Sequence, residues 1–117
     1  MKKSNTDKAD AYFLRGLECE EAGDIDRALK YYRKASRLGV PQAQCSLGTL
    51  YDDVIKPDNP QKAVYWYKRA VKNGDSMAAY NLAIHYRNLS KPKWHKFWMR
   101  KAAAMGDEDA KSEIKNL

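Results

Sequence analysis

The chain contains four side chains that commonly bind transition metals, two cysteines and two histidines, and their spacing does not fit a metal site. Cys19 and Cys45 lie 26 residues apart, so they form no Cys-x-x-Cys pair. His85 and His95 lack the His-Glu-x-x-His order that places two ligands on one face of a helix. Convergence of all four on zinc is the weakest alternative, because free cysteines are more commonly buried as small apolar side chains. We therefore expect no metal and no cofactor.

The sequence also lacks a pattern typical of catalytic groups. Adjacent carboxylates occur at Glu20-Glu21 and Asp52-Asp53, but neighbouring side chains on a helix do not face each other as an acid–base couple. The six glycines are dispersed rather than gathered in a phosphate-binding loop. No spacing places a general base beside a serine or cysteine nucleophile. The sequence therefore predicts a protein that is not an enzyme and has no catalytic residues.

The composition is typical of a soluble globular protein with a basic excess. Of 117 residues, 22 are Lys or Arg and 15 are Asp or Glu, which gives a formal net charge of +7. No apolar run approaches the ~20 residues of a membrane span. A polar segment follows Met1-Lys2-Lys3, where a secretory signal needs an apolar one, so we expect a cytoplasmic chain. This basic excess is compatible with binding to nucleic acid or to a membrane surface, and equally with an ordinary solvated surface.

The same order of residues occurs three times along the chain. In each copy an aromatic pair or its substitute precedes two basic residues, an alanine and, four residues on, a glycine. The copies are Tyr31-Tyr32-Arg33-Lys34-Ala35, Trp66-Tyr67-Lys68-Arg69-Ala70 and Trp98-Met99-Arg100-Lys101-Ala102. The copies follow one another at intervals of 35 and 32 residues. A repeat of this length indicates a solenoid, in which each unit buries its apolar face against its neighbours. The repeats extend over about 11–42, 43–77 and 78–109.

Proline, glycine and capping residues divide each repeat into two helices. Asp24 and Asn59 are typical N-cap residues, and Gly39, Gly74 and Gly106 are typical of left-handed helix ends. Helices are predicted near 7–22, 25–38, 42–53, 60–73, 76–89, 93–105 and 107–116. The fold class predicted is all-α, a right-handed α-solenoid of about three antiparallel helix-pair repeats plus a C-terminal helix, with a tail over residues 1–5.

Small and large side chains recur at fixed repeat positions. Gly16, Gly48 and Ala83 share one position, which we expect where two helices of a pair approach closely. Tyr31, Trp66 and Trp98 share another, which we expect in the core rather than as base-stacking platforms. Trp94 and Phe97 are less constrained by the repeat and are expected to be partly exposed.

This pattern resembles the Sel-1-like repeat, a relative of the tetratricopeptide repeat. The middle unit carries the resemblance through Ala43-x3-Leu47-Gly48-x2-Tyr51, an insert around Pro57-Asp58, and Lys62-Ala63-x2-Trp66-Tyr67-Lys68-Arg69-Ala70-x3-Gly74. The first unit has the shorter spacing of a tetratricopeptide unit, so we interpret it as a hybrid or a capping repeat. The resemblance covers roughly residues 9–113 and implies that 1–117 form one repeat domain.

The resemblance implies a non-catalytic interaction or scaffold module. In such stacks the first helices line a concave groove, and the implied groove positions lie six and three before the small contact residue and one, four and five after it. These residues are Asp10, Phe13, Leu17, Glu20 and Glu21, then Gln42, Cys45, Thr49, Asp52 and Asp53, then Met77, Tyr80, Ile84, Arg87 and Asn88. The inferred groove has an apolar floor, formed by Phe13, Leu17, Cys45, Met77, Tyr80 and Ile84, and an acidic rim, formed by Glu20, Glu21, Asp52 and Asp53.

The second helix of each pair is basic, and the first helices of units one and two become acidic toward their C-terminal ends. Residues 10–26 carry −5 and 27–37 carry +5, while 62–72 carry +4 and 87–101 carry +6. An acidic rim suits a protein or peptide partner with a basic segment; alternatively, the rim is simply solvated and Phe13 and Leu17 pack on a further N-terminal neighbour. We interpret the basic second helices as a solvated outer face. The alternative is that they bind nucleic acid or an anionic surface. A bacterial neutralising partner of a toxin or effector is a third hypothesis.

Overall fold

Helices account for most of the residues that the structure describes. The computed structural model describes residues 5–56 and 58–117, and within these ranges it contains helices and no strand. The helices are α1 (Asn5–Glu21), α2 (Ile25–Arg37), α3 (Pro41–Thr49), α4 (Pro60–Lys72), α5 (Ser76–Asn88), α6 (Pro92–Ala104) and α7 (Glu108–Glu113), with short turns η1 (Leu50–Val54) and η2 (Ile114–Asn116). The predicted all-α fold is confirmed, and each predicted helix matches an observed one.

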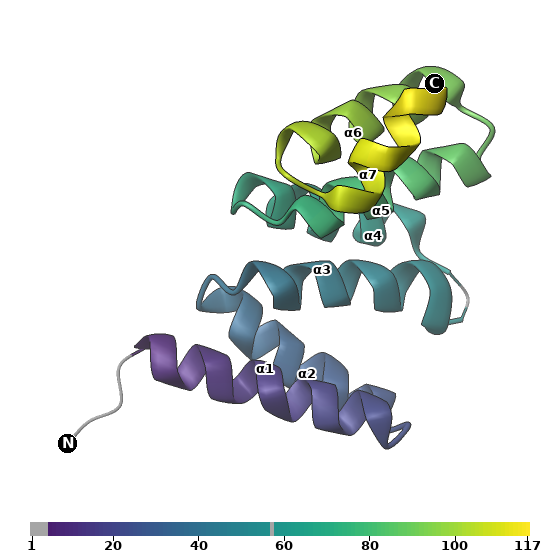
Figure 1. Ribbon diagram of the computed structural model, residues 1–117. Coiled ribbons are helices and arrows are strands. Elements are labelled where there is room, and N and C mark those ends of the chain that lie inside the picture. The colour runs from purple at the N-terminus through teal and green to yellow at the C-terminus, as the bar shows by residue number, and fades with distance from the viewer. Residues whose placement is uncertain (1–4, 57) are drawn as a thin grey trace.

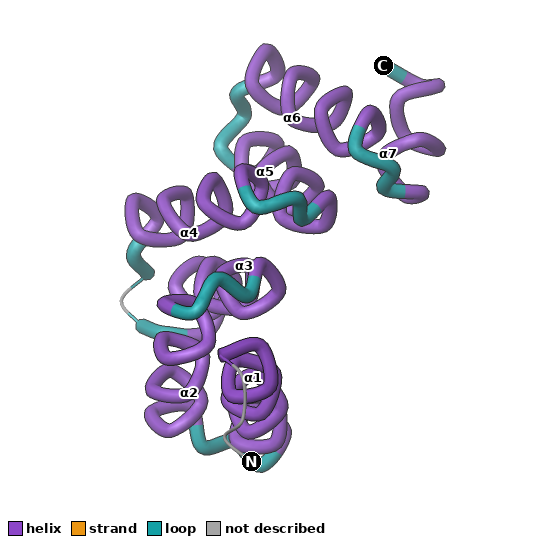
Figure 2. The backbone as a smooth tube through the Cα atoms, turned by 90° about the vertical axis from the view of Figure 1, so that its left-hand side faces the viewer, coloured by secondary structure: helices purple, strands orange, loops and turns teal. Residues whose placement is uncertain are grey.

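The helices stack in pairs along one direction. Figure 1 shows α1 and α2 at one end, α3 and α4 in the middle, and α5 with α6 and α7 at the other end. In Figure 2, α1, α3 and α5 lie along one side of the stack, α2 and α4 lie on the opposite side, and α6 lies above α5 at the top of the view. The molecule extends 50 × 33 × 21 Å, as expected for a short solenoid. The predicted solenoid of three helix pairs and a terminal helix is therefore confirmed.

The helix ends follow local sequence signals. The side chains of Asp24, Asn59 and Asp107 each accept a hydrogen bond from a backbone N–H in the first turn of the following helix. Four helices end at a glycine with positive φ, as predicted for Gly39, Gly74 and Gly106. At the end of α5 a serine takes the place of the glycine. Ser90 has a φ of 55°, a conformation that costs a residue with a Cβ about 1–2 kcal/mol.

A buried ring fills the space left by each small contact residue. Tyr32 and Tyr67 are buried, and their rings lie so close to Gly16 and Gly48 that a Cβ there would meet ring carbons at 2.5 and 2.6 Å. In the third repeat Ala83 takes the place of glycine, and the flexible, fully buried Met99 replaces the ring. Glycine is therefore required where the partner is a rigid ring.

The second member of each aromatic pair is the one that is buried. The pattern predicted Tyr31, Trp66 and Trp98 as core, but these side chains are only partly buried. Trp66 and Trp98 pack against the core from outside. The reason is helical geometry, since adjacent residues point about 100° apart and only one of each pair faces the neighbouring helix.

Two predicted segments differ in detail from the structure. The helix predicted over 42–53 leaves α-geometry at Leu50 and closes with the π-helical turn η1, in which the Ile55 N–H donates to the Leu50 carbonyl at 2.8 Å. Pro57, within the predicted insert, lies outside the described residues. In the predicted tail, residues 1–4 also lie outside them, and Asn5 already belongs to α1.

Candidate partner-binding groove

The first helices of the three pairs together form a groove. α1, α3 and α5 enclose a hollow of about 390 Å³. It is lined by Phe13, Leu17, Glu20, Gln42, Cys45, Ser46, Thr49, Asp75, Met77 and Asn81. From α3 it is lined by Gln42 and by three smaller side chains, Cys45, Ser46 and Thr49.

The floor of this hollow is mostly apolar. Met77 is 60% exposed and Leu17 is also exposed, so their apolar surface is available to a partner. Phe13 packs its ring 5.9 Å from that of Tyr32, which holds it in place from below. Burial raises the pKa of the Cys45 thiol to about 12, so that it stays protonated and behaves as a small apolar group. The floor therefore favours an apolar anchor.

The groove continues toward an acidic end. A smaller hollow of about 140 Å³ shares Thr49 and Asn81 with the first and adds Asp52, Asp53 and Ile84. A third, of about 280 Å³, shares Asp52 and Asp53 and adds Asp58. Among the described residues that line these three hollows there are five carboxylates and no Lys or Arg. The groove as a whole therefore favours positive charge at the end formed by η1 and the end of α5.

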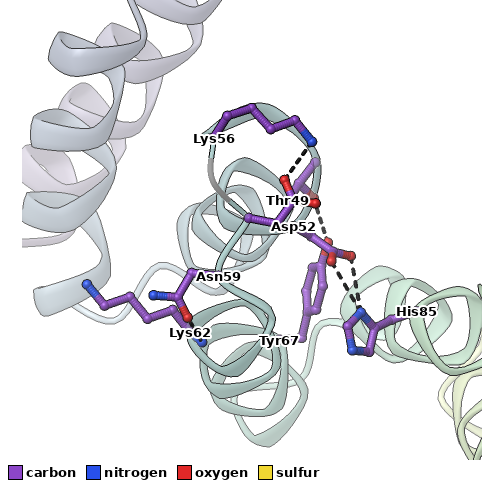
Figure 3. Close-up of polar contacts among 8 residues, drawn as sticks. Thr49, Asp52, Lys56, Asn59, Lys62, Tyr67 and His85 are labelled. Carbon is purple, nitrogen blue, oxygen red and sulfur yellow. Dashed lines mark hydrogen bonds and ion pairs between the residues drawn. The ribbon is translucent and has the colours of Figure 1, made fainter. Parts of the chain in front are cut away.

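Several of these carboxylates already have partners in the fold, as Figure 3 shows for the acidic end. Asp52 points at His85, whose Nδ1 lies 3.2 Å from Oδ1 of the carboxylate. Beside it, the hydroxyls of Thr49 and Tyr67 are 3.2 Å apart, and Asp58 is paired with Lys56. Asp53 is exposed and is the carboxylate at this end best placed for an incoming cation.

At the apolar end, two further carboxylates are held by the scaffold. Glu20 accepts a hydrogen bond of 2.6 Å from the hydroxyl of Tyr32, whose pKa is raised by burial and by this bond. Asp75 caps α5 by accepting from the Met77 N–H at 3.0 Å. Burial raises the pKa of Asp75, although its backbone hydrogen bonds oppose that shift. Both groups thus serve the fold and line the groove at the same time.

The structure brings together eleven of the fifteen residues predicted for the groove. These are Phe13, Leu17, Glu20, Gln42, Cys45, Thr49 and Met77 at the apolar end, and Asp52, Asp53, Ile84 and Asn88 beyond them. Asp10, Glu21, Tyr80 and Arg87 do not line the three hollows. Tyr80 donates its hydroxyl proton to Glu113 of α7 at 2.8 Å, a bond that raises the Tyr80 pKa, so its ring belongs to the C-terminal end of the stack.

In the first hollow, sequence reasoning missed Ser46, Asn81 and Asp75. At the acidic end it missed Asp58, Pro60, Tyr67, His85 and Leu89. Ser46 and Asn81 both lie two residues before the small contact residue, and so three or four residues from other groove positions on the same helix face. That spacing could have identified them. Asp75 precedes its helix, and its capping role gave no indication that it also faces the groove.

Other sites considered from the sequence find no support in the arrangement of the described residues. In this part of the chain no three His, Cys, Asp or Glu side chains lie together in a way that could hold a metal ion. His95 bonds the carbonyl of Ala83 at 3.0 Å, away from the His85–Asp52 pair. No helix of residues 5–56 or 58–117 is long and apolar enough to cross a membrane.

Family models match the chain along most of its length. The Sel1 repeat model matches residues 41–75, 76–90 and 96–107, and the tetratricopeptide repeat model matches 9–39. The second match agrees with the tetratricopeptide spacing of the first unit. Repeats of these two families generally mediate protein–protein interactions and are typically non-catalytic.

Known proteins show the same similarity. The chain is 37% identical over 95 residues to the F-box protein At1g70590 of Arabidopsis thaliana, a match covering 70% of this chain and 27% of that protein. It thus spans about a quarter or less of the curated relatives that it matches. It superposes on c5321, a protective antigen of uropathogenic Escherichia coli with an SLR fold, with a TM-score of 0.79 and 31% identity over 92% of this chain and 25% of that one.

A second solved structure matches nearly end to end. It is a Sel1 repeat protein from Oxalobacter formigenes, with a TM-score of 0.70 and 28% identity, covering 97% of this chain and 96% of that chain. The repeat model accounts for more than half of the residues, and the paired helices, the small contact residues and the glycine helix ends repeat in the same order. The chain belongs to the Sel1 repeat family.

Proposed function

We propose that the chain is a scaffold module that binds a protein or peptide segment along the groove formed by α1, α3 and α5. The observation that carries this proposal is the continuity of the groove from an apolar floor to an acidic end without a lining Lys or Arg among the described residues. A segment with an apolar anchor followed by Lys or Arg satisfies both ends at once. The anchor would cover Met77 and Leu17, and the cation would face Asp53.

The two ends of the groove contribute in different ways. Covering exposed apolar side chains stabilises a complex by roughly 25 cal/mol for each Å² removed from water. Charge at the edge of an interface mainly raises the association rate and selects the partner. The proposal therefore predicts that apolar substitutions change the dissociation rate, and that charge substitutions change the association rate and its salt dependence.

Two groove variants and two matched controls test this proposal. Tagged wild-type protein and the variants Met77→Glu and Asp53→Lys are used to recover partners from cells. Tyr65→Glu is the control for the first, because Tyr65 is also exposed but lies on α4 and lines none of the three hollows. Asp26→Lys, on α2, is the control for the second because the change in charge is the same.

We expect both groove variants to lose partners that the controls retain. All four variants change exposed side chains, so circular dichroism should show the wild-type helix content. The groove proposal is wrong if Met77→Glu and Asp53→Lys recover the wild-type partners, or if the controls lose the same partners. Glu20 and Asp52 are poor choices for this test because each is hydrogen-bonded within the fold.

The same proposal treats residues 1–117 as one interaction domain located in the cytoplasm and without catalytic activity. A single cooperative unfolding transition, seen identically by two probes, would support one domain. Fractionation of cells that express the tagged chain would test its location.

A further inference from the structure

The outer face of α6 carries two aromatic side chains that the fold does not bury. Trp94 is 51% exposed and Phe97 is 52% exposed. Their rings touch each other with centroids 6.0 Å apart, and Phe97 also contacts Trp98 at 5.2 Å. This side of the chain is separate from the groove, since the residues that line the groove come from α1, α3, η1, α4, α5 and their loops.

Basic side chains surround these rings. On a helix, residues three and four positions apart are neighbours, so Phe97 has Lys93, Arg100 and Lys101 around it, and all three are exposed. Lys96 adds a further exposed cation one residue away. We call Lys93, Trp94, Lys96, Phe97, Arg100 and Lys101 the α6 aromatic surface.

The charge of this part of the chain has one sign. From residue 76 to 106 there are six Lys or Arg residues and no Asp or Glu. Of the acidic residues that follow, Asp107 caps α7, Glu108 pairs with Lys111 and Glu113 accepts a bond from Tyr80. In the first two repeats, by contrast, acidic and basic helices alternate. The basic excess of the whole chain is therefore concentrated around exposed aromatic rings.

We propose that the α6 aromatic surface binds the anionic headgroups of a lipid bilayer, with Trp94 and Phe97 entering the interfacial region. A helix with exposed aromatic residues among Lys and Arg is suited to lie in the plane of a membrane interface. Indole rings favour the headgroup level, where one edge is apolar and the other is hydrated. Each Lys or Arg near an anionic leaflet strengthens binding about fivefold, corresponding to about 1 kcal/mol.

The arrangement of the rings favours a bilayer over nucleic acid. Proteins that bind single strands present open aromatic faces on which successive bases stack. Here the Trp94 and Phe97 rings meet at 80°, and the Phe97 and Trp98 rings at 88°. One side of Trp94 also lies against Tyr86, with an interplanar angle of 35°. Such rings form an apolar wedge between cations rather than a row of parallel faces.

Vesicle flotation tests this proposal with the full chain. The probes are phosphatidylcholine vesicles alone and with 30 mol% phosphatidylserine, each at 0.05, 0.15 and 0.5 M salt. We expect binding only to the phosphatidylserine vesicles, weakening steeply with salt because the screening length falls to a few ångströms. Lys93→Gln with Lys96→Gln should lower the partition constant roughly thirtyfold. Phe97→Ser should lower it about five- to tenfold.

Matched variants on α4 separate the α6 aromatic surface from general basicity. Lys68→Gln with Lys72→Gln removes the same charge, and Tyr65→Ser removes a ring that occupies the same repeat position as Phe97 and is 53% exposed. These controls should bind vesicles nearly as the wild type does. The groove variant Met77→Glu should also keep vesicle binding, which makes the outcome independent of the proposed groove function.

A fluorescence readout reports insertion directly. Addition of phosphatidylserine vesicles should shift tryptophan emission of the wild type to shorter wavelength, and Trp94→Phe should lose this shift while it still floats with the vesicles. Failure to bind these vesicles at 0.05 M salt would overturn the proposal. So would equal losses in the α4 controls, or binding to a DNA or RNA oligonucleotide in the absence of vesicle binding.

Discussion

Replacing Gly48 with alanine adds one methyl group where α3 crosses α4, and we expect it to destabilise the fold. An ideal Cβ at position 48 would lie 2.6 Å from two ring carbons of Tyr67, whereas carbons in contact are normally about 3.5–4.0 Å apart. Tyr67 is buried, and its hydroxyl is 3.2 Å from that of Thr49. The ring therefore has to move by about 1 Å inside a packed core.

Two opposing effects determine the size of the change. Alanine is favoured over glycine inside a helix by about 1 kcal/mol. Overpacking a core costs about 1–3 kcal/mol and sometimes more, and the displaced ring also strains its hydroxyl contact, worth about 1 kcal/mol. We expect the free energy of unfolding to fall by about 2 kcal/mol. For a chain of this size the melting temperature should fall by roughly 10 °C.

Urea titration followed by circular dichroism and tryptophan fluorescence measures this difference. Gly16→Ala is an independent repetition, because its Cβ would lie 2.5 Å from the Tyr32 ring. Combining Gly48→Ala with Tyr67→Met reproduces the Ala83–Met99 pair of the third repeat, where both side chains are fully buried. The double variant should be more stable than the sum of the single effects by about 1–2 kcal/mol.

The outcome that contradicts this reasoning is specific. If Gly48→Ala stabilises the chain by about 1 kcal/mol with an unchanged dependence on urea, helix propensity alone decides and the ring contact is not tight. The exposed substitution Lys68→Ala serves as the control and should change stability by no more than about 0.5 kcal/mol.

Three further predictions concern other parts of the fold. Ser90→Gly should stabilise the fold by about 1 kcal/mol, because φ at this residue is 55°. Gly106→Ser should destabilise it by about as much. Equal melting temperatures of these variants and the wild type in thermal scans would contradict this. Gln44→Met should lower the free energy of unfolding in urea titrations by about 1–3 kcal/mol. The buried Gln44 donates to the Ser36 carbonyl at 3.3 Å and accepts from the Asn73 amide at 2.9 Å. A loss of only a few tenths of a kcal/mol would show that these bonds contribute little. At pH 8 the native Cys45 should react with a thiol reagent about three orders of magnitude more slowly than an ordinary cysteine. The reason is that burial raises the pKa of Cys45 to about 12 and only the thiolate reacts. The reaction rate should keep rising with pH toward about 12, and a plateau near pH 9 would refute the raised pKa.

The helix pattern was predictable because its determinants are local. The side chains of Asp24 and Asn59 accept hydrogen bonds from backbone N–H groups only three residues away. The positive φ at Gly74 depends on the absence of a side chain at that residue. Each signal acts within about one helical turn, so it can be recognised in the sequence alone. The repeat spacing then indicated that the helices pair and stack, and through the family resemblance most of the groove positions.

The candidate site was predictable only in part, because several of its residues are defined by distant contacts. Asp52 was predicted as a rim carboxylate, but it lies against His85, which is 33 residues away. Tyr80 was predicted in the floor, but its hydroxyl bonds Glu113. Asp75 acts locally as a cap, yet it also faces Cys45 across the groove. Such pairings depend on how helices from different repeats are placed, and no spacing within one repeat specifies them.

The sequence by itself therefore determined the helices, their ends, their pairing and the family of the chain. The tertiary structure decided which side chain of each aromatic pair enters the core, which acidic groups are already paired, and where the basic excess lies in space. Tyr32 and Tyr67 are buried because they meet glycines on a neighbouring helix, while Trp94 and Phe97 stay exposed because nothing among the described residues covers the outer face of α6. The physical reason is that burial and charge pairing depend on the relative placement of whole helices, whereas helix formation depends on residues within a few positions of one another.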